Sequence, residues 1–157
     1  LKNVNLSVIC DLNQAKLEEA EIVFSRSKIT SDPGVILEDP SIEAVIIATP
    51  ANTHFDLASK ALRVGKHILI EKPITTSTEQ ALELKKLNSK IKKIIMAGHT
   101  FEYNPAVLKM KEIIKDENFG KVYYIYSTRV NLGQIRGDVN ALWNLAPHDI
   151  SMSNYLY

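Results

Sequence analysis

The sequence predicts an α/β fold: a partial, doubly wound parallel sheet followed by the start of an α/β domain with a mostly antiparallel sheet. The first observation is that continuous apolar runs alternate with stretches of helical periodicity as far as residue 115, the pattern of repeated β-α units. Such strands belong to a parallel sheet that helices cover on both faces. The second is a longer strand with mixed polar positions after Gly120, typical of an antiparallel edge. We therefore expect one domain over residues 1–99 and the beginning of a second over residues 100–157.

The first half of the chain is expected to hold three strands and three helices. Pro50 stops the second strand, and Gly65 closes the third helix as a left-handed cap. The buried side of the first helix would be formed by Ala15, Leu17, Ala20, Ile22, Val23 and Phe24. In order, the elements are a strand at 6–10, a helix at 13–25, a small helix at 35–38, a strand at 44–48, a helix at 52–64 and a strand at 67–70.

The second half continues the alternation and then departs from it. Pro73 breaks the third strand, and Pro147 suits only the first turn of a helix. The last helix should therefore start near Leu145 or Ala146, with Asn144 as its cap. The elements expected before it are a helix at 78–88, a strand at 94–97, a helix at 105–115 and the long strand at 122–131.

Composition excludes several classes of protein. The 157 residues are 45% apolar and 24% charged, which is globular rather than disordered, and the net charge of +1 offers no basic surface for nucleic acid. The single cysteine, Cys10, cannot form an internal disulfide and favours a cytoplasmic location. No apolar run approaches the ~20 residues of a membrane span. The four histidines lack the spacing of metal ligands, so no metal is expected.

The polar residues that end the strands are the first candidates for a site. In an open parallel sheet, ligands bind beyond the carboxyl ends of the strands. Asp11 stands where a dinucleotide-binding fold uses a carboxylate to hold the adenosine ribose, and no basic residue follows at 12–14, which favours NAD over NADP. The glycine fingerprint, about 20 residues earlier, would precede Leu1, so we expect a fragment of a longer protein. Alternatively, Asp11 simply caps the next helix.

Two further segments carry candidate chemistry. In Glu71-Lys72-Pro73, the lysine could donate a hydrogen bond or a proton to a reacting hydroxyl, and a cis Lys72-Pro73 bond could fix the turn. His148 is expected near the positive end of its helix, where a neutral ring that accepts a proton is favoured. The alternatives are an ordinary surface turn and a structural histidine. Further candidates for binding a substrate are Tyr103, Asn104 and Arg129.

Taken together, Asp11, the segment at 49–54, Glu71-Lys72-Pro73, Tyr103-Asn104-Pro105 and the late His148 resemble the Gfo/Idh/MocA oxidoreductases, in the right order along nearly the whole chain. Residues 98–100 and 143–151 look most like the nucleotide-sugar 3-dehydrogenases of polysaccharide biosynthesis. The resemblance implies a Rossmann dinucleotide-binding domain, then a substrate and oligomerisation domain. It also implies oxidation of a ring hydroxyl of a sugar or nucleotide sugar with NAD(P), by a protein that is a homo-oligomer when complete.

The resemblance also implies roles for individual residues. Lys72 and His148 would flank the reacting carbon. The dinucleotide would be lined by Asp11, Thr49, Pro50, Asn52, His54, Glu71 and Lys72, and the substrate would meet Tyr103, Asn104, Arg129 and Asn144. Two positions depart from the family pattern: Asn144 stands where many members have Asp, and Glu102 where relatives often have a basic residue.

Two other classes of function remain open from the residues alone. A phosphorylation-receiver domain also has an acid, a threonine and a Lys-Pro at successive strand ends, as in Asp11, Thr49 and Lys72-Pro73. Against it, no Met-Pro turn follows Asp11, and the chain continues well past Lys72. The other alternative is a nucleotide-binding fragment without catalysis. Without a glycine loop, we expect the 157 residues alone to be inactive and to bind NAD weakly.

Overall fold

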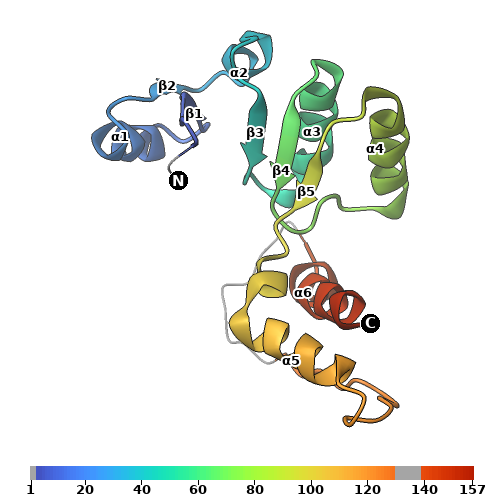
Figure 1. Ribbon diagram of the computed structural model, residues 1–157. Coiled ribbons are helices and arrows are strands. Elements are labelled where there is room, and N and C mark those ends of the chain that lie inside the picture. Colours follow the sequence, from blue (N-terminus) through green and yellow to red (C-terminus); the bar gives the residue numbers. More distant parts are fainter. Residues whose placement is uncertain (1–2, 130–138) are drawn as a thin grey trace.

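The computed structural model describes residues 3–129 and 139–157, and its strands form two parallel sheets (Figure 1). In the smaller sheet, β1 (Val8–Cys10) pairs with β2 (Lys28–Thr30), with Ile9 opposite Ile29. The larger sheet has the order β3-β4-β5 and consists of β3 (Ala44–Ile47), β4 (His67–Ile70) and β5 (Ile95–Ala97). The predicted α/β class with parallel strands is confirmed. β2 was not predicted, because its Lys-Ile-Thr sequence has a single apolar residue.

Asparagine or serine side chains cap the N-termini of four of the described helices. Asn13 accepts hydrogen bonds from Ala15 and Lys16, Ser77 accepts one from Gln80, and Gly65 has the predicted positive φ of 78° after the third helix. The helices are α1 (Gln14–Val23), α2 (Gly34–Glu38), α3 (His54–Arg63), α4 (Thr78–Ile91), α5 (Pro105–Lys115) and α6 (Ala141–Leu156), with 3-10 turns η1 (Ala51–Thr53) and η2 (Thr100–Tyr103). No helix in the described ranges combines the length and apolarity needed to cross a bilayer.

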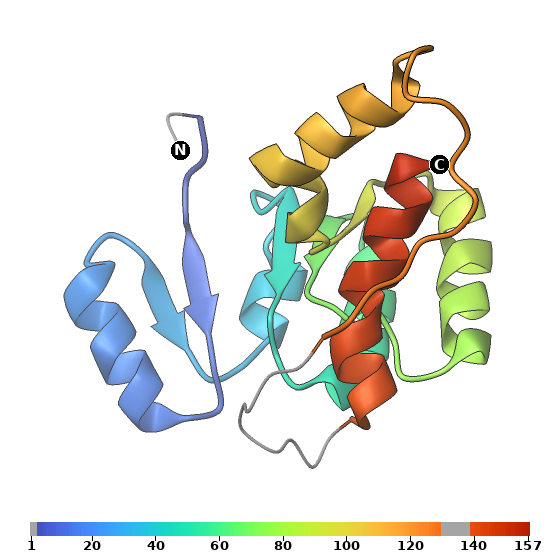
Figure 2. The same cartoon turned by 90° about the horizontal axis from the view of Figure 1, so that it is seen from below.

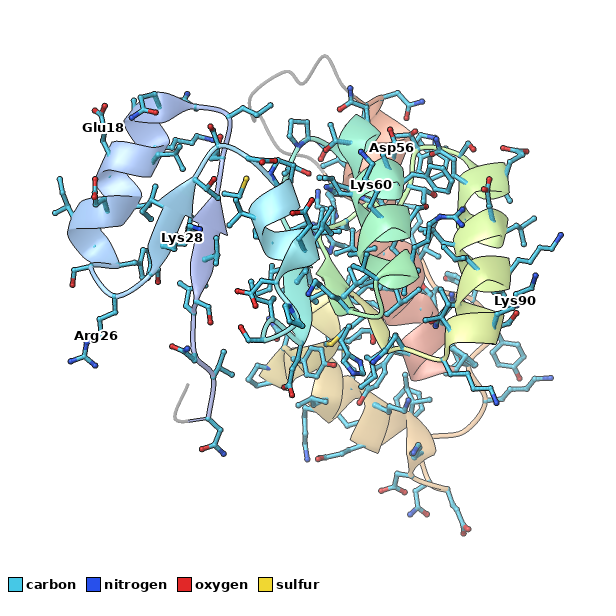
Figure 3. All side chains as sticks on the ribbon, turned by 90° about the horizontal axis from the view of Figure 1, so that it is seen from above. Glu18, Arg26, Lys28, Asp56, Lys60 and Lys90 are labelled. Carbon is cyan, nitrogen blue, oxygen red and sulfur yellow. The ribbon has the colours of Figure 1, made fainter. Side chains whose placement is uncertain are left out.

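The main core lies where α3 and α4 cover one face of the larger sheet (Figure 1). Leu62 of α3 and Ile70 of β4 are completely buried there. The opposite face is not covered by the described residues, and Ile46 and Met96 are 67% and 42% exposed on it. The expectation of a sheet covered on both faces is therefore wrong for this part of the chain. Charged side chains such as Lys90 project outward from the helical layer (Figure 3).

The apolar side predicted for the first helix is also wrong. Leu17 is buried, but Ile22 and Val23 of α1 are 84% and 70% exposed. The reason is the position of the β1-α1-β2 unit, which stands apart from the larger sheet in both views (Figures 1 and 2). A groove of about 670 Å³ with mostly apolar walls separates β1 from β3. Nothing from the larger sheet therefore packs against the far side of α1.

The C-terminal part packs beneath the carboxyl ends of β3, β4 and β5 (Figures 1 and 2). There α5 and α6 lie side by side, and the Lys111 ammonium donates to the carbonyl of Tyr155 and sits 3.7 Å from the centre of its ring. This arrangement brings α6 to the end of the sheet where parallel-sheet proteins bind ligands.

Two expectations for this part are wrong. The last helix begins at Ala141 rather than near Leu145, because Asn140 caps it by accepting a 3.0 Å hydrogen bond from Trp143, and Pro147 lies inside the helix. The strand expected at 122–131 is absent as far as Arg129, and its last two residues lie outside the described ranges. A strand needs a hydrogen-bonded neighbour, and in the described part of the chain none lies beside this segment.

Candidate active site

The residues that follow β4 meet α6 through Lys72. Its ammonium donates hydrogen bonds to the backbone carbonyl of Asn144 at 2.9 Å and to the side-chain oxygen of Asn144 at 3.0 Å. The Lys72-Pro73 peptide bond is cis, as the sequence suggested. Both acceptors are neutral, so Lys72 is oriented here without forming an ion pair with Asn144. Asn144 thus serves Lys72 rather than capping a helix.

His148 lies one turn after Asn144 on the same helix. Its ring packs against Phe101, with 4.6 Å between the ring centres. Burial lowers the pKa of His148, the positive charges of Lys72, Arg129 and His99 lower it further, and Asp149 partly opposes them. The ring nitrogen Nδ1 is buried and has no hydrogen-bond partner among the described residues. His148 is therefore a neutral imidazole at physiological pH, able to accept a proton.

The predicted cause of that neutrality was wrong. The sequence predicts His148 in the first turn of its helix, near the positive end of the dipole. His148 is well inside α6, which starts at Ala141, and the dipole effect is confined to the terminal turn. Burial and neighbouring cations produce the same result by a different route.

An ion pair beside His148 was missed by the sequence analysis. The Arg129 guanidinium donates to both carboxylate oxygens of Asp149, from Nε at 3.0 Å and from Nη2 at 3.1 Å, and Ser127 donates to the same carboxylate at 2.9 Å. These hydrogen bonds lower the pKa of Asp149 and raise that of Arg129. Arg129 also lies over the Phe101 ring, at 5.0 Å from its centre.

His54 links the ends of β3 and β4. The side chain is 1% exposed, and its ring nitrogens lie 2.7 Å from the carbonyl of Pro73 and 2.8 Å from that of Thr49. A neutral imidazole carries one N–H, so His54 donates a hydrogen bond to one of these two carbonyls, while its buried ring packs between both turns. The Thr49 turn is held further by a 2.7 Å contact between the hydroxyls of Thr49 and Thr53.

Replacing His54 by alanine is expected to lower the free energy of unfolding by about 3 kcal/mol, because a carbonyl next to the buried ring loses its hydrogen-bond donor and a cavity forms. Chemical denaturation followed by circular dichroism measures the change. Lys60→Ala, on the exposed side of the same helix (Figure 3), is the matched control and should change stability by less than about 0.5 kcal/mol. Equal losses in the two variants would contradict a bridging role for His54.

The structure places the other residues predicted for the site on several different elements. Asp11 ends β1, where its carboxylate accepts a 2.9 Å hydrogen bond from the backbone of Asn13 and lies 3.7 Å from the Lys16 ammonium. Asn13, not Asp11, caps α1, so the capping alternative for Asp11 is wrong. Lys16, just beyond residues 12–14, is therefore a basic neighbour of Asp11 that the sequence comparison of NAD with NADP did not include. The remaining residues are Asn52, exposed in η1, Tyr103, 66% exposed in η2, and Asn104, whose side chain caps α5.

A separate cavity of about 680 Å³ lies between the start of α4 and α6, with Ile74, Trp143 and Ile150 in its walls. It contains neither Lys72 nor His148, so it is distinct from the candidate site. In the described part of the chain, no group of three or more His, Cys, Asp or Glu side chains is arranged to hold a metal ion.

Comparison with known proteins defines the class. Residues 1–99 match the model of an oxidoreductase family with an NAD-binding Rossmann fold, the Gfo/Idh/MocA family. The chain is 36% identical over 128 residues to the scyllo-inositol 2-dehydrogenase (NAD(+)) of Bacillus subtilis, an alignment that covers 79% of the chain and 36% of the relative.

Solved structures agree with this class. A levoglucosan dehydrogenase in complex with NADH and levoglucosan superposes with a TM-score of 0.81 at 28% identity, over 96% of this chain and 44% of that one. The oxidoreductase yvaA of Bacillus subtilis superposes with a TM-score of 0.84 over 100% of this chain and 46% of the other, at 23% identity. The chain thus spans less than half the length of these relatives. It belongs to the Gfo/Idh/MocA oxidoreductase family, as its motifs suggested.

Proposed function

We propose that the complete protein is an NAD-dependent dehydrogenase that oxidises a ring hydroxyl of a sugar or a related polyol. The observation that carries the proposal is that Lys72 hydrogen-bonds Asn144, one turn before His148 on α6, and that its charge lowers the pKa of the His148 ring. A neutral imidazole can take up the hydroxyl proton and an ammonium can stabilise the developing alkoxide, and both effects assist the oxidation of an alcohol. Family membership argues against the receiver-domain alternative.

Local geometry at the carboxyl ends of β4 and β5 supports an NAD site. Gly98 follows β5, and a Cβ atom on it would lie 3.2 Å from the carboxylate atoms of Glu71. Glycine leaves room for that carboxylate beside the backbone, where we propose that it accepts a hydrogen bond from a ribose hydroxyl. Asp11 offers a second carboxylate for the other ribose. We propose that the dinucleotide is held by Asp11, Thr49, Pro50, Asn52, Glu71 and Lys72, with His54 bracing the turns.

The chemistry follows from the protein's own groups. His148 removes the proton of the substrate hydroxyl, and Lys72 stabilises the negative charge that develops on the oxygen. Bound NAD, held by residues such as Asp11 and Glu71, would supply the acceptor for the hydride of the carbon. Asn144 holds the Lys72 ammonium in place through its backbone carbonyl and its side-chain oxygen.

The substrate is proposed first as a broad chemical class and then as a narrower choice. The named relatives act on inositol and levoglucosan, which are neutral ring polyols. The segments at 98–100 and 143–151 support a nucleotide sugar as the narrower choice, within polysaccharide biosynthesis. Tyr103, Asn104 and Asn144 would contact the substrate, and residues 100–157 would begin the substrate and oligomerisation domain of a cytoplasmic homo-oligomer.

The test is an assay of the protein expressed from its full reading frame. NADH formation is followed by absorbance with inositols, levoglucosan and nucleotide sugars as substrates, and with NAD or NADP as cofactor. Oxidation of any ring hydroxyl with NAD supports the proposal, and oxidation of nucleotide sugars alone supports the narrower choice. Labelling of Asp11 by a small phosphodonor, with no reduction of NAD, would refute it.

Replacing Gly98 by alanine is expected to weaken NAD binding about tenfold, because the new Cβ displaces the Glu71 carboxylate that lies 3.2 Å away; a factor of ten corresponds to about 1.4 kcal/mol, roughly one hydrogen bond to a charged group. Isothermal titration of the full-length protein with NAD measures the change. Gly120→Ala adds a Cβ that meets nothing within 4 Å but strains a backbone with φ +84°, so it is the control for general destabilisation and should bind NAD normally. Undiminished NAD affinity in Gly98→Ala would show that NAD binding does not depend on the present position of the Glu71 carboxylate.

A further inference from the structure

We propose that Arg129, held by Asp149 against the Phe101 ring, is a positioning residue for His148. The proposal rests on the function proposed for His148 and deepens it by naming the groups that set the behaviour of the base. We call Phe101, Arg129 and Asp149 the clamp.

The clamp fixes the His148 ring through one aromatic side chain. Phe101 contacts His148, with 4.6 Å between ring centres, and the Arg129 guanidinium lies 5.0 Å from the centre of the same Phe101 ring. A guanidinium over an aromatic ring is attracted to it and restricts its rotation. Because His148 Nδ1 has no hydrogen bond to another described residue, ring packing is what orients this side chain.

Asp149 fixes the guanidinium in turn. Its two oxygens receive two parallel hydrogen bonds from Arg129, and the side chains of the pair are only 26% and 21% exposed. Bidentate pairs of this kind define geometry better than a single contact does. The ion pair joins the 121–129 segment to α6. Three separate parts of the chain therefore meet at His148, namely η2, the 121–129 segment and α6.

The clamp also sets the charge around His148. The charged or titratable groups that face its ring are Lys72 after β4, His99 before η2, Arg129 and Asp149. Arg129 lowers the pKa of His148 and Asp149 raises it, so the two members of one ion pair act on the base with opposite signs. The two charges of the ion pair therefore partly cancel in their effect on the pKa of His148. Replacing either residue alone should shift that pKa in the direction set by the charge that remains.

The experiment measures the titration of His148 by NMR in the full-length protein with labelled histidine. Arg129→Met removes a cation and leaves the Asp149 carboxylate unpaired, so the pKa of His148 should rise. Asp149→Asn removes the carboxylate and leaves the cation, so the pKa should fall further. A purely structural role would loosen the packing in both variants and move both pKa values upward, because burial lowers the pKa in the intact protein.

Two further variants separate geometry from charge. Arg129→Lys keeps the cation but loses the planar fork, so the ring-current shift that Phe101 imposes on His148 should change while the pKa stays below that of Arg129→Met. Lys121→Met makes the same change of charge in the same segment, at a cation 5.8 Å from the Tyr123 ring, and should leave His148 unaltered.

The pH profile of kcat/KM reports the same pKa during catalysis, through its acidic limb, where activity falls as the base becomes protonated. It should move to higher pH in Arg129→Met and to lower pH in Asp149→Asn, if His148 is the base. Shifts of the NMR pKa in the same direction, or no shift in either variant, would overturn the clamp. Opposite NMR shifts without movement of the limb would keep the clamp and instead refute the proposed role of His148.

Discussion

Replacing His148 by alanine in the full-length protein lowers kcat by about 10²–10⁴-fold and leaves NAD affinity unchanged, if His148 is the general base. The lowered pKa of the side chain keeps it proton-free and ready to accept the hydroxyl proton. Its ring packs against Phe101, which is not among the residues proposed to hold NAD, so its removal should leave the cofactor site in place. Steady-state turnover and a separate NAD titration measure the two quantities.

His67→Gln is the matched control, because His67 begins β4 at the end opposite Lys72 and interacts through Nδ1 with the backbone of Ile94. Its turnover should equal that of the unaltered protein. Normal kcat in His148→Ala would remove His148 from the mechanism, and a parallel loss of NAD affinity would assign it a role in binding instead.

Replacing Lys72 by methionine is expected to lower kcat by about 10²–10³-fold, the usual cost of losing one donor that stabilises a developing oxyanion. The variant also loses the two hydrogen bonds to Asn144, at 2.9 and 3.0 Å, which join the end of β4 to α6. Lys72→Arg should recover little of the rate, since a planar guanidinium cannot replace a compact ammonium held by two oxygens of one residue.

The measurement is kcat and KM of each variant with the best ring polyol found for the full-length protein. Lys85→Met, on the exposed side of α4, makes the same change of charge away from the site and should keep normal turnover. A Lys72→Met variant that loses affinity for substrate but keeps kcat would show that Lys72 only binds the substrate.

Elements bounded by strong local signals were predicted well. The strand at 67–70 and the helix at 105–115 have the predicted bounds, because Gly65, Pro73 and Pro105 mark their ends. The ends of the central strands, and hence Glu71 and Lys72, followed from continuous apolar runs in a parallel sheet. The cis bond before Pro73 was also predicted.

Features that depend on tertiary neighbours were not predictable from the sequence. The start of α6 was misplaced because a rule about proline outweighed the cap at Asn140, and packing against η2 and α5 stabilises a helix that contains Pro147. The pair of Arg129 and Asp149 joins positions 20 residues apart whose approach depends on how the 121–129 segment lies along α6. Nothing periodic in the sequence marks such a pair.

The groove between β1 and β3 makes this chain two bodies of unequal rigidity. Within residues 3–30 the unit of β1, α1 and β2 has Leu17 as its one buried residue, whereas the core lies around Leu62 and Ile70 on the other side of the groove. Local unfolding of the smaller body therefore requires much less free energy. A dinucleotide reaching from Asp11 to Glu71 would crosslink the two, and part of its binding free energy would be used to restrict their relative motion.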